Sequence, residues 1–201
     1  MLCRENRLTI VRACPGSGKT RLFAEILNEI VSTWPAKKAG VAALSFTNVA
    51  QEEITKNLGE QLQYPHFVGT LDSFMLRYIV KPFGHLAGLS SKGPRLIPSP
   101  LDEIIENPKV KIGPKPEDER SIFKIRFVDE SEKGPNMVIR NELSLKYEPI
   151  SNKYVYEILK KKGEEWAQNG RITHSDCQYL SSKILKNKEY SNSILKLIVR
   201  R

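Results

Sequence analysis

The sequence predicts an α/β fold built on a parallel sheet. A short run rich in β-branched residues at 8–13 leads directly into a Gly-rich loop, and apolar residues then recur at helical spacing as far as Trp34. Pro35 ends this predicted helix, and a second apolar run follows at 40–46. Alternating strands and helices are typical of a parallel sheet, because parallel neighbours need a crossover connection between them.

The same alternation continues to residue 80. Asn48 suits the N-cap of a helix that extends to about residue 62, because its short side chain can accept backbone hydrogen bonds. The predicted apolar side of that helix is formed by Val49, Ile54 and Leu58. A strand at His66–Gly69 and a helix over 71–80 follow, and Pro82 stops that helix.

After residue 84 this alternation fails. Eight of the twelve prolines lie between Pro94 and Pro149, where they interrupt any long helix or strand. Two alternating stretches at 123–128 and 137–146 predict antiparallel strands joined by a turn, and helical periodicity returns afterwards. The predicted domains are an α/β portion at 1–84, an α+β insertion at 85–170 and a return to the first domain at 171–201.

The Gly-rich loop between the first predicted strand and helix has the pattern of a phosphate-binding P-loop. Its glycines allow backbone torsions that turn successive N–H groups toward an anion, and the following helix adds the positive end of its dipole. Lys19 would contact the β- and γ-phosphates, and the Thr20 hydroxyl would bind Mg²⁺. The predicted site for ATP and Mg²⁺ comprises Ala13, Cys14, Pro15, Gly16, Ser17, Gly18, Lys19 and Thr20.

This loop identifies only the broad class of P-loop proteins, because kinases, GTPases, transporters and helicases share it. An ordinary Gly-rich turn is the plainer alternative, but it leaves the Lys19-Thr20 pair and the strand–loop–helix context unexplained. The full pattern begins with Gly, whereas this chain has Ala13 there. The choice within the class therefore depends on the segments after the loop.

Composition and charge limit which partners and which cellular location the sequence predicts. The net charge is +9; residues 152–201 carry 11 Lys and Arg against 5 Asp and Glu, whereas residues 85–151 carry 11 of each. The run Lys160-Lys161-Lys162 indicates either a solvated helix face or a surface that follows a nucleic-acid backbone. The three cysteines and three histidines lack the spacing of a metal site. No apolar run is long enough to span a bilayer and no secretory signal is evident, so we predict a cytoplasmic protein without a membrane partner.

Three segments resemble motifs of one helicase family. The form Ala-x-x-Gly-x-Gly-Lys-Thr at 13–20 is common in superfamily 1 helicases of the UvrD/Rep type. Residues 44–54 (LSFTNVAQEEI) are similar to that family's motif Ia, and residues 68–77 (VGTLDSFMLR) are similar to its motif Ib. The chain therefore resembles the N-terminal ATP-binding part of a UvrD/Rep-type DNA helicase. That resemblance implies a P-loop NTPase fold with a RecA-like parallel sheet and an α+β insertion, termed subdomain 1B, at about 85–170.

The resemblance also implies single-stranded DNA as a partner. The implied DNA contacts are Phe46, Thr47 and Asn48 in motif Ia and Thr70 and Ser73 in motif Ib. An aromatic side chain can stack on a base while hydroxyl groups hold phosphate oxygens. A core aromatic at the end of a buried strand is the alternative for Phe46. Asp72 departs from the family, which usually has His at this position, and an acidic side chain would repel a phosphate.

Other family motifs are not found within the 201 residues. No Gln that could contact adenine precedes Ala13. Motif II should be an apolar strand ending in Asp-Glu, which holds Mg²⁺ and orients the attacking water. The string Phe127-Val128-Asp129-Glu130 fits superficially, but it lies in the Pro-rich insertion and continues with Ser-Glu-Lys. We interpret it as a coincidence, and we expect motif II to follow Arg201.

The sequence thus predicts the ATP-binding portion of a UvrD-like ATP-dependent DNA helicase, inactive alone, that works with a second chain or a C-terminal motor half. Two alternatives stay open. One is a non-catalytic module that binds ATP or DNA, or serves as a partner subunit. The other is a small P-loop kinase, which would need an Arg-rich lid and would leave the motif Ia match at 46–48 without a role.

Overall fold

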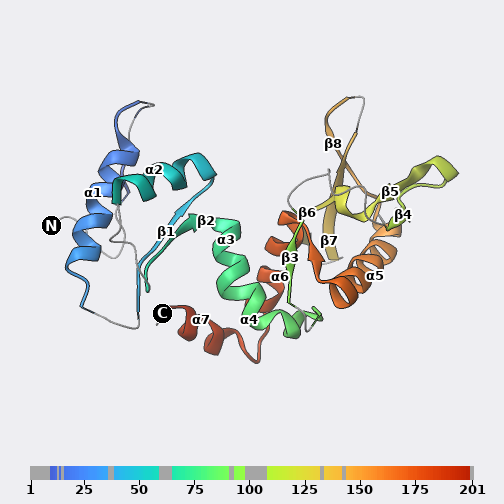
Figure 1. Ribbon diagram of the computed structural model, residues 1–201. Coiled ribbons are helices and arrows are strands. Elements are labelled where there is room, and N and C mark those ends of the chain that lie inside the picture. The colour runs from blue at the N-terminus through green and yellow to red at the C-terminus, as the bar shows by residue number, and fades with distance from the viewer. Residues whose placement is uncertain are drawn as a thin grey trace. The chain divides into compact units, whose positions relative to one another are not determined.

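A computed structural model describes residues 10–12, 14, 16–35, 39–58, 65–90, 93–97, 108–131, 134–141 and 144–199 (Figure 1). The chain divides into two compact units, one within Met1–Leu71 and the other over Asp72–Val199. Helices and strands occur in both units, which confirms a mixed α/β chain.

The first unit contains two strands and two helices in alternation: α1 (Lys19–Ser32), β1 (Ala42–Ser45), α2 (Asn48–Leu58) and β2 (Phe67–Thr70). The strands β1 and β2 are parallel, with Ala42 opposite Phe67 and Ser45 opposite Thr70. The core of this unit comprises Leu27, Ala43, Ile54 and Leu58. These four elements confirm the strands and helices that periodicity predicts, within a few residues at each end.

Two expectations for this unit are wrong in detail. Residues 10–12 form no strand, although the predicted first strand spans 8–13; Ala13 and the residues before Ile10 lie outside the described part. Ile10 and Val11, two of the residues that predicted this strand, are 71% and 55% exposed. The parallel ladder of the described unit therefore has two strands. Val49 is likewise exposed, and only Ile54 and Leu58 of the predicted apolar side of α2 are buried.

The second unit begins with a continuous helical segment. The helix α3 (Leu71–Met75) continues through a π-helical turn (Leu76–Val80) into α4 (Lys81–Phe83) and a 3₁₀ turn (Gly84–Ala87). The remaining strands and helices of this unit are β3 (Arg95–Leu96), β4 (Lys109–Lys111), β5 (Glu119–Ser121), β6 (Ile125–Ser131), β7 (Gly134–Arg140), β8 (Tyr147–Pro149), α5 (Asn152–Asn169), β9 (Arg171–Ile172), α6 (His174–Leu185) and α7 (Ser191–Val199). Short 3₁₀ turns at Pro116–Asp118 and Ile122–Lys124 flank β5.

Strands β6, β7 and β8 form an antiparallel sheet, which confirms the predicted hairpin. The second strand is shorter than predicted: it ends at Arg140, and the chain turns before β8 with Leu145 at a φ of +57°. Two further pairs complete the ladders, the antiparallel pair β4–β5 and the parallel pair β3–β9. The core beneath the sheet comprises Val110, Ile122, Ile125, Met137, Ile139, Ile150, Val155 and Ile158.

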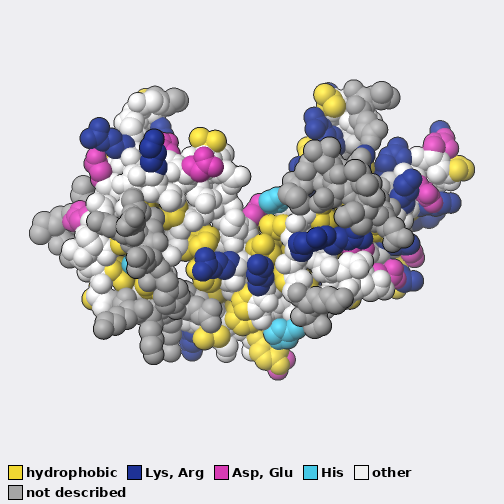
Figure 2. Space-filling model, in the orientation of Figure 1, with side chains coloured by type: hydrophobic (Ala, Val, Ile, Leu, Met, Phe, Trp, Pro, Cys, Tyr) yellow, Lys and Arg dark blue, Asp and Glu magenta, His cyan; other side chains and the backbone are white. Residues whose placement is uncertain are grey.

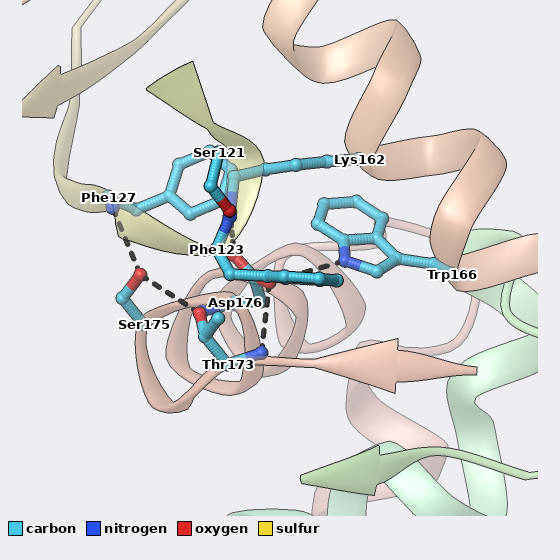
Figure 3. Close-up of polar contacts among 8 residues, drawn as sticks. All are labelled: Ser121, Phe123, Phe127, Lys162, Trp166, Thr173, Ser175 and Asp176. Carbon is cyan, nitrogen blue, oxygen red and sulfur yellow. Dashed lines mark hydrogen bonds and ion pairs between the residues drawn. The ribbon is translucent and has the colours of Figure 1, made fainter. Parts of the chain in front are cut away.

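A buried ion pair joins α5 to α6 (Figure 3). Nζ of Lys162 donates to Oδ1 of Asp176 at 2.6 Å, and both side chains are 1% exposed. The other carboxylate oxygen accepts from the backbone N–H of Thr173 at 3.0 Å and from Nε1 of Trp166 at 3.4 Å. Asp176 is thus both the ion-pair partner and the capping-box residue of α6.

The strand β6 packs on α6. The ring of Phe127 stacks on that of Tyr179 with 4.1 Å between centroids, and Nζ of Lys162 lies 5.3 Å from the Phe127 ring centroid. The backbone N–H of Phe127 donates to Oγ of Ser175 at 3.2 Å. These contacts fix the hairpin sheet against α6.

Candidate functional site

The phosphate loop ends in a pair of left-handed glycines. Gly16 and Gly18 have φ values of +75° and +79°, immediately before α1 begins at Lys19. A Cβ added at either position would meet no atom within 4 Å, so the backbone torsion, and not lack of space, requires glycine here. Ala13 and Pro15 of the predicted site lie outside the described residues.

Cys14 closes the loop through its carbonyl oxygen. That oxygen accepts from the backbone N–H of Ser17 at 3.3 Å, from the Ser17 hydroxyl at 2.7 Å and from Nζ of Lys19 at 2.6 Å. The lysine side chain therefore lies back over the loop, and its ammonium group is beside the backbone that a phosphate would approach. Thr20 follows as the second residue of α1 and is partly buried.

The start of α1 can receive an anion. The residue before the helix is Gly18, so no side chain caps the first turn, and the first helical bond runs from the N–H of Leu22 to the carbonyl of Gly18. The first N–H groups of any helix lack intrahelical partners, and the helix dipole adds positive potential there. This arrangement suits a phosphate group, because the N–H groups of the first turn belong to the turn that begins with Lys19.

Phe46 and Thr47 of motif Ia lie in the turn between β1 and α2. Phe46 is 94% exposed, so the alternative of a core aromatic is wrong. The Thr47 hydroxyl accepts from the N–H of Ala50 at 3.2 Å, and Ser45 donates to the Thr47 carbonyl at 2.8 Å. Thr47 therefore caps α2, and Asn48 is its first helical residue instead of the predicted N-cap.

The motif Ib residues follow β2. Thr70 is the last residue of that strand and Ser73 lies in α3. Between them, the Asp72 carboxylate contacts two residues of α6: Oδ2 is 2.9 Å from Nδ1 of His174, and Oδ1 accepts from Nε2 of Gln178 at 3.0 Å. The acidic residue that departs from the family pattern thus bonds to a helix about one hundred positions further along the chain.

The Asp129-Glu130 pair lies on the antiparallel strand β6 after a bulge. Oδ1 of Asp129 accepts from Nδ2 of Asn136 at 2.6 Å, and Oε2 of Glu130 accepts from Nζ of Lys186 at 2.8 Å. Both carboxylates therefore take part in contacts within the second unit. In the part of the chain that the structure describes, no group of three His, Cys, Asp or Glu side chains could hold a metal ion.

The basic C-terminal part is not one uniform surface. Lys160 and Lys161 are exposed on α5, whereas Lys162 is buried against Asp176, so the lysine run is not entirely a solvated helix face. In the view of Figure 2, the Lys and Arg side chains form separate groups instead of one continuous band.

Cys177, next to Asp176, is buried. Burial, and then the nearby Asp72 carboxylate, raises the pKa of its thiol to about 12.

The family model described as UvrD/REP helicase N-terminal domain matches residues 1–197. The chain belongs to this family. Its members are ATP-dependent helicases that have a P-loop NTPase fold, use ATP with Mg²⁺ and bind DNA. No curated protein and no solved structure matched the chain. Over the described residues, none of the helices has the length and apolar character needed to cross a membrane.

Proposed function

We propose that this chain binds the phosphates of ATP, together with Mg²⁺, at the loop of residues 13–20. The observation that supports it most is the pair of positive φ torsions at Gly16 and Gly18 directly before α1, in a chain of the UvrD/REP family. These torsions direct successive backbone N–H groups to one side, as an anion requires. The described residues that would hold the nucleotide are Cys14, Gly16, Ser17, Gly18, Lys19 and Thr20, with Ala13 and Pro15 completing the loop.

The side chains of the loop suit distinct tasks. Lys19 would exchange its contact with the Cys14 carbonyl for the β- and γ-phosphate oxygens, since a charged oxygen is the stronger acceptor. Thr20, at the start of α1, would offer its hydroxyl to the metal. Mg²⁺, when bound, neutralises charge between the β- and γ-phosphates.

Titration calorimetry tests this site. Wild-type chain should bind ATP with Mg²⁺, and Lys19→Ala should abolish the measurable heat. Lys56→Ala is the matched control, because Lys56 is an exposed lysine of α2 in the same unit. Equal binding of ATP by wild type and Lys19→Ala would refute the assignment of the nucleotide site to this loop.

We also propose that single-stranded DNA contacts Phe46, Thr47 and Asn48, with Thr70 and Ser73 holding its phosphates. The exposure of Phe46 supports it, because burial of an aromatic ring is favourable and this ring is 94% exposed at the end of β1. Binding of this type is independent of sequence and weakens as salt rises.

Fluorescence anisotropy with a labelled oligothymidylate at two salt concentrations is the measurement. Phe46→Ala should weaken binding about tenfold through lost base stacking, whereas Phe46→Trp should retain it. The free energy of unfolding should change by less than about 0.5 kcal/mol in both variants, because the site is exposed. Equal affinity of wild type and Phe46→Ala would exclude Phe46 from the DNA contact.

We further propose that 1–84 and 171–201 belong to one RecA-like domain that residues 85–170 interrupt. Packing within the second unit supports the proposal that the chain returns to the first domain after the insertion. Ile79, before the insertion, forms one buried cluster with Ile184 and Ile194, which follow it. Limited proteolysis should cut within 85–170 and leave the flanking fragments associated. Separation of these fragments on gel filtration would contradict this organisation.

A further inference from the structure

The antiparallel sheet β6–β7–β8 (Figure 1) has one face in the core, and most of the described side chains on its other face are exposed. Ile125, Met137 and Ile139 point into the core that also contains Val155 and Ile158 of α5. Because side chains alternate along a strand, their neighbours lie on the opposite side. This outer face includes Arg126, Asp129, Asn136, Val138, Arg140, Tyr147 and Pro149.

An aromatic ring lies beside a guanidinium group on the outer face. Arg140 is directly opposite Tyr147 in the β7–β8 ladder, and the guanidinium carbon of Arg126 is 5.1 Å from the centroid of the Tyr147 ring. Nε of Arg140 donates to the carbonyl of Leu145 at 3.3 Å, so one N–H of the Arg140 guanidinium is bonded to the backbone between β7 and β8. Tyr147 is nevertheless 46% exposed, and both arginines are exposed.

The acidic side chains of this sheet lie elsewhere. Asp129 is at the opposite end of the outer face, where it bonds to Asn136. Glu130 bonds to Lys186, the residue that follows α6, and Glu148, opposite Ile139 on the other side of the sheet, accepts from Nδ2 of Asn141 at 2.7 Å. Among the described residues, the end of the outer face that carries Arg126, Arg140 and Tyr147 therefore holds two positive charges and no carboxylate, although residues 85–151 as a whole are neutral.

We propose that this end of the outer face is a second nucleic-acid site, in which a base of a single strand stacks on Tyr147 while Arg126 and Arg140 contact the adjoining phosphates. Single-stranded nucleic acid supplies both a π face and anionic oxygens at the spacing of one nucleotide, and an aromatic ring beside planar cations suits both. An acidic peptide supplies only the anions. This site lies within Asp72–Val199 and contains none of the residues at 46–48, so it is independent of the proposed motif Ia contact.

The test measures anisotropy of a labelled oligothymidylate with the full 201-residue chain, in wild type and in Phe46→Ala. In both backgrounds, Tyr147→Ala should lower the affinity about five- to tenfold and Tyr147→Phe should retain it. Arg126→Gln should reduce the slope of log affinity against log salt by about 0.7, as the loss of one phosphate contact on a single strand does. Tyr156→Ala is the matched control, since Tyr156 is an exposed tyrosine of α5 in the same unit.

Each result has a definite meaning. Unchanged affinity in Tyr147→Ala, with a native circular dichroism spectrum, would overturn the second site, as would equal losses in Tyr147→Ala and Tyr156→Ala. Complete loss of binding in Phe46→Ala alone would also overturn it. Loss in Tyr147→Ala with no effect of Phe46→Ala would support the second site and reject the motif Ia contact. Competition by polyglutamate as effective as that by unlabelled oligothymidylate would identify an acidic peptide as the ligand instead.

Discussion

Asp72 and His174 are 102 positions apart in the sequence, and Oδ2 of the first lies 2.9 Å from Nδ1 of the second. Gln178, one helical turn beyond His174, donates to the other carboxylate oxygen. The first turn of α3 is therefore tied to the first two turns of α6. This contact gives the departure from His at position 72 a structural reason, because the carboxylate has two hydrogen-bonding partners on α6.

The first prediction concerns this carboxylate. Asp72→Ala should lower the free energy of unfolding by about 1 kcal/mol, since the two hydrogen bonds are lost but His174 is more than half exposed to solvent. Urea unfolding measures the change, with the exposed Glu52 of α2 replaced by Ala as the control. Higher affinity of Asp72→Asn for single-stranded DNA would show instead that this carboxylate repels the strand.

The buried pair Lys162–Asp176 should be the most sensitive site of the second unit. Lys162→Met or Asp176→Asn alone should cost about 3–5 kcal/mol, because each leaves one buried charge without its partner. The double variant should be less destabilised than the sum of the two, since no buried charge remains. Urea unfolding of the four proteins gives the coupling energy. Lys161→Met, at the adjacent exposed position, should change stability by less than about 0.5 kcal/mol, and a larger loss there would contradict this account.

The strands and helices of the first unit were predictable because their signals are local. Apolar residues at helical spacing place α1 and α2, and the torsions that the loop requires are specified by Gly16 and Gly18 themselves. The absence of a strand at Ile10–Arg12 was not predictable, because apolar content indicates a strand only where other residues bury it. The helix α2 begins one residue earlier than expected, since the Thr47 hydroxyl competes with Asn48 for the cap.

The contacts that join distant segments were not accessible from periodicity alone. The lysine run at 160–162 suggested a solvated face, yet Lys162 lies four residues after the buried Ile158 and four before the buried Trp166. That helical spacing was the available signal for its burial. Nothing local signals that Asp72 pairs with His174, because no pattern within either segment refers to the other. The separation of charge across the hairpin sheet was also hidden, since a count over 85–151 sums both faces.

The cysteines should differ in reactivity. Cys14 is exposed in the phosphate loop, whereas Cys177 is buried with a thiol pKa raised to about 12, so at pH 8 the Cys177 thiol is almost entirely protonated and unreactive. In a Cys3→Ser background, a thiol reagent should label Cys14 quickly and Cys177 only after unfolding in urea. Raising the pH to 9 should leave Cys177 largely protonated, because its pKa is raised. Fast labelling of two thiols in the folded chain would refute this prediction, and protection of Cys14 by ATP with Mg²⁺ would add support for the nucleotide site.

The last prediction is that the 201-residue chain by itself neither hydrolyses ATP at a helicase-like rate nor unwinds duplex DNA. Phosphoryl transfer depends on positioning and on stabilising charge, and an arginine that stabilises the transferred phosphate contributes about 10³–10⁵ in rate. The segment Phe127–Glu130 resembles the water-orienting Asp-Glu motif, but it lies on the antiparallel strand β6. There Asp129 bonds to Asn136, and Glu130 bonds to Lys186. Both carboxylates take part in contacts within the second unit, so we do not expect them to hold a metal or orient water. A phosphate-release assay with and without single-stranded DNA should give only background turnover. Asp129→Ala and Glu130→Ala should leave ATP binding unchanged. Robust DNA-stimulated turnover that either substitution abolishes would instead identify this pair as the catalytic carboxylates.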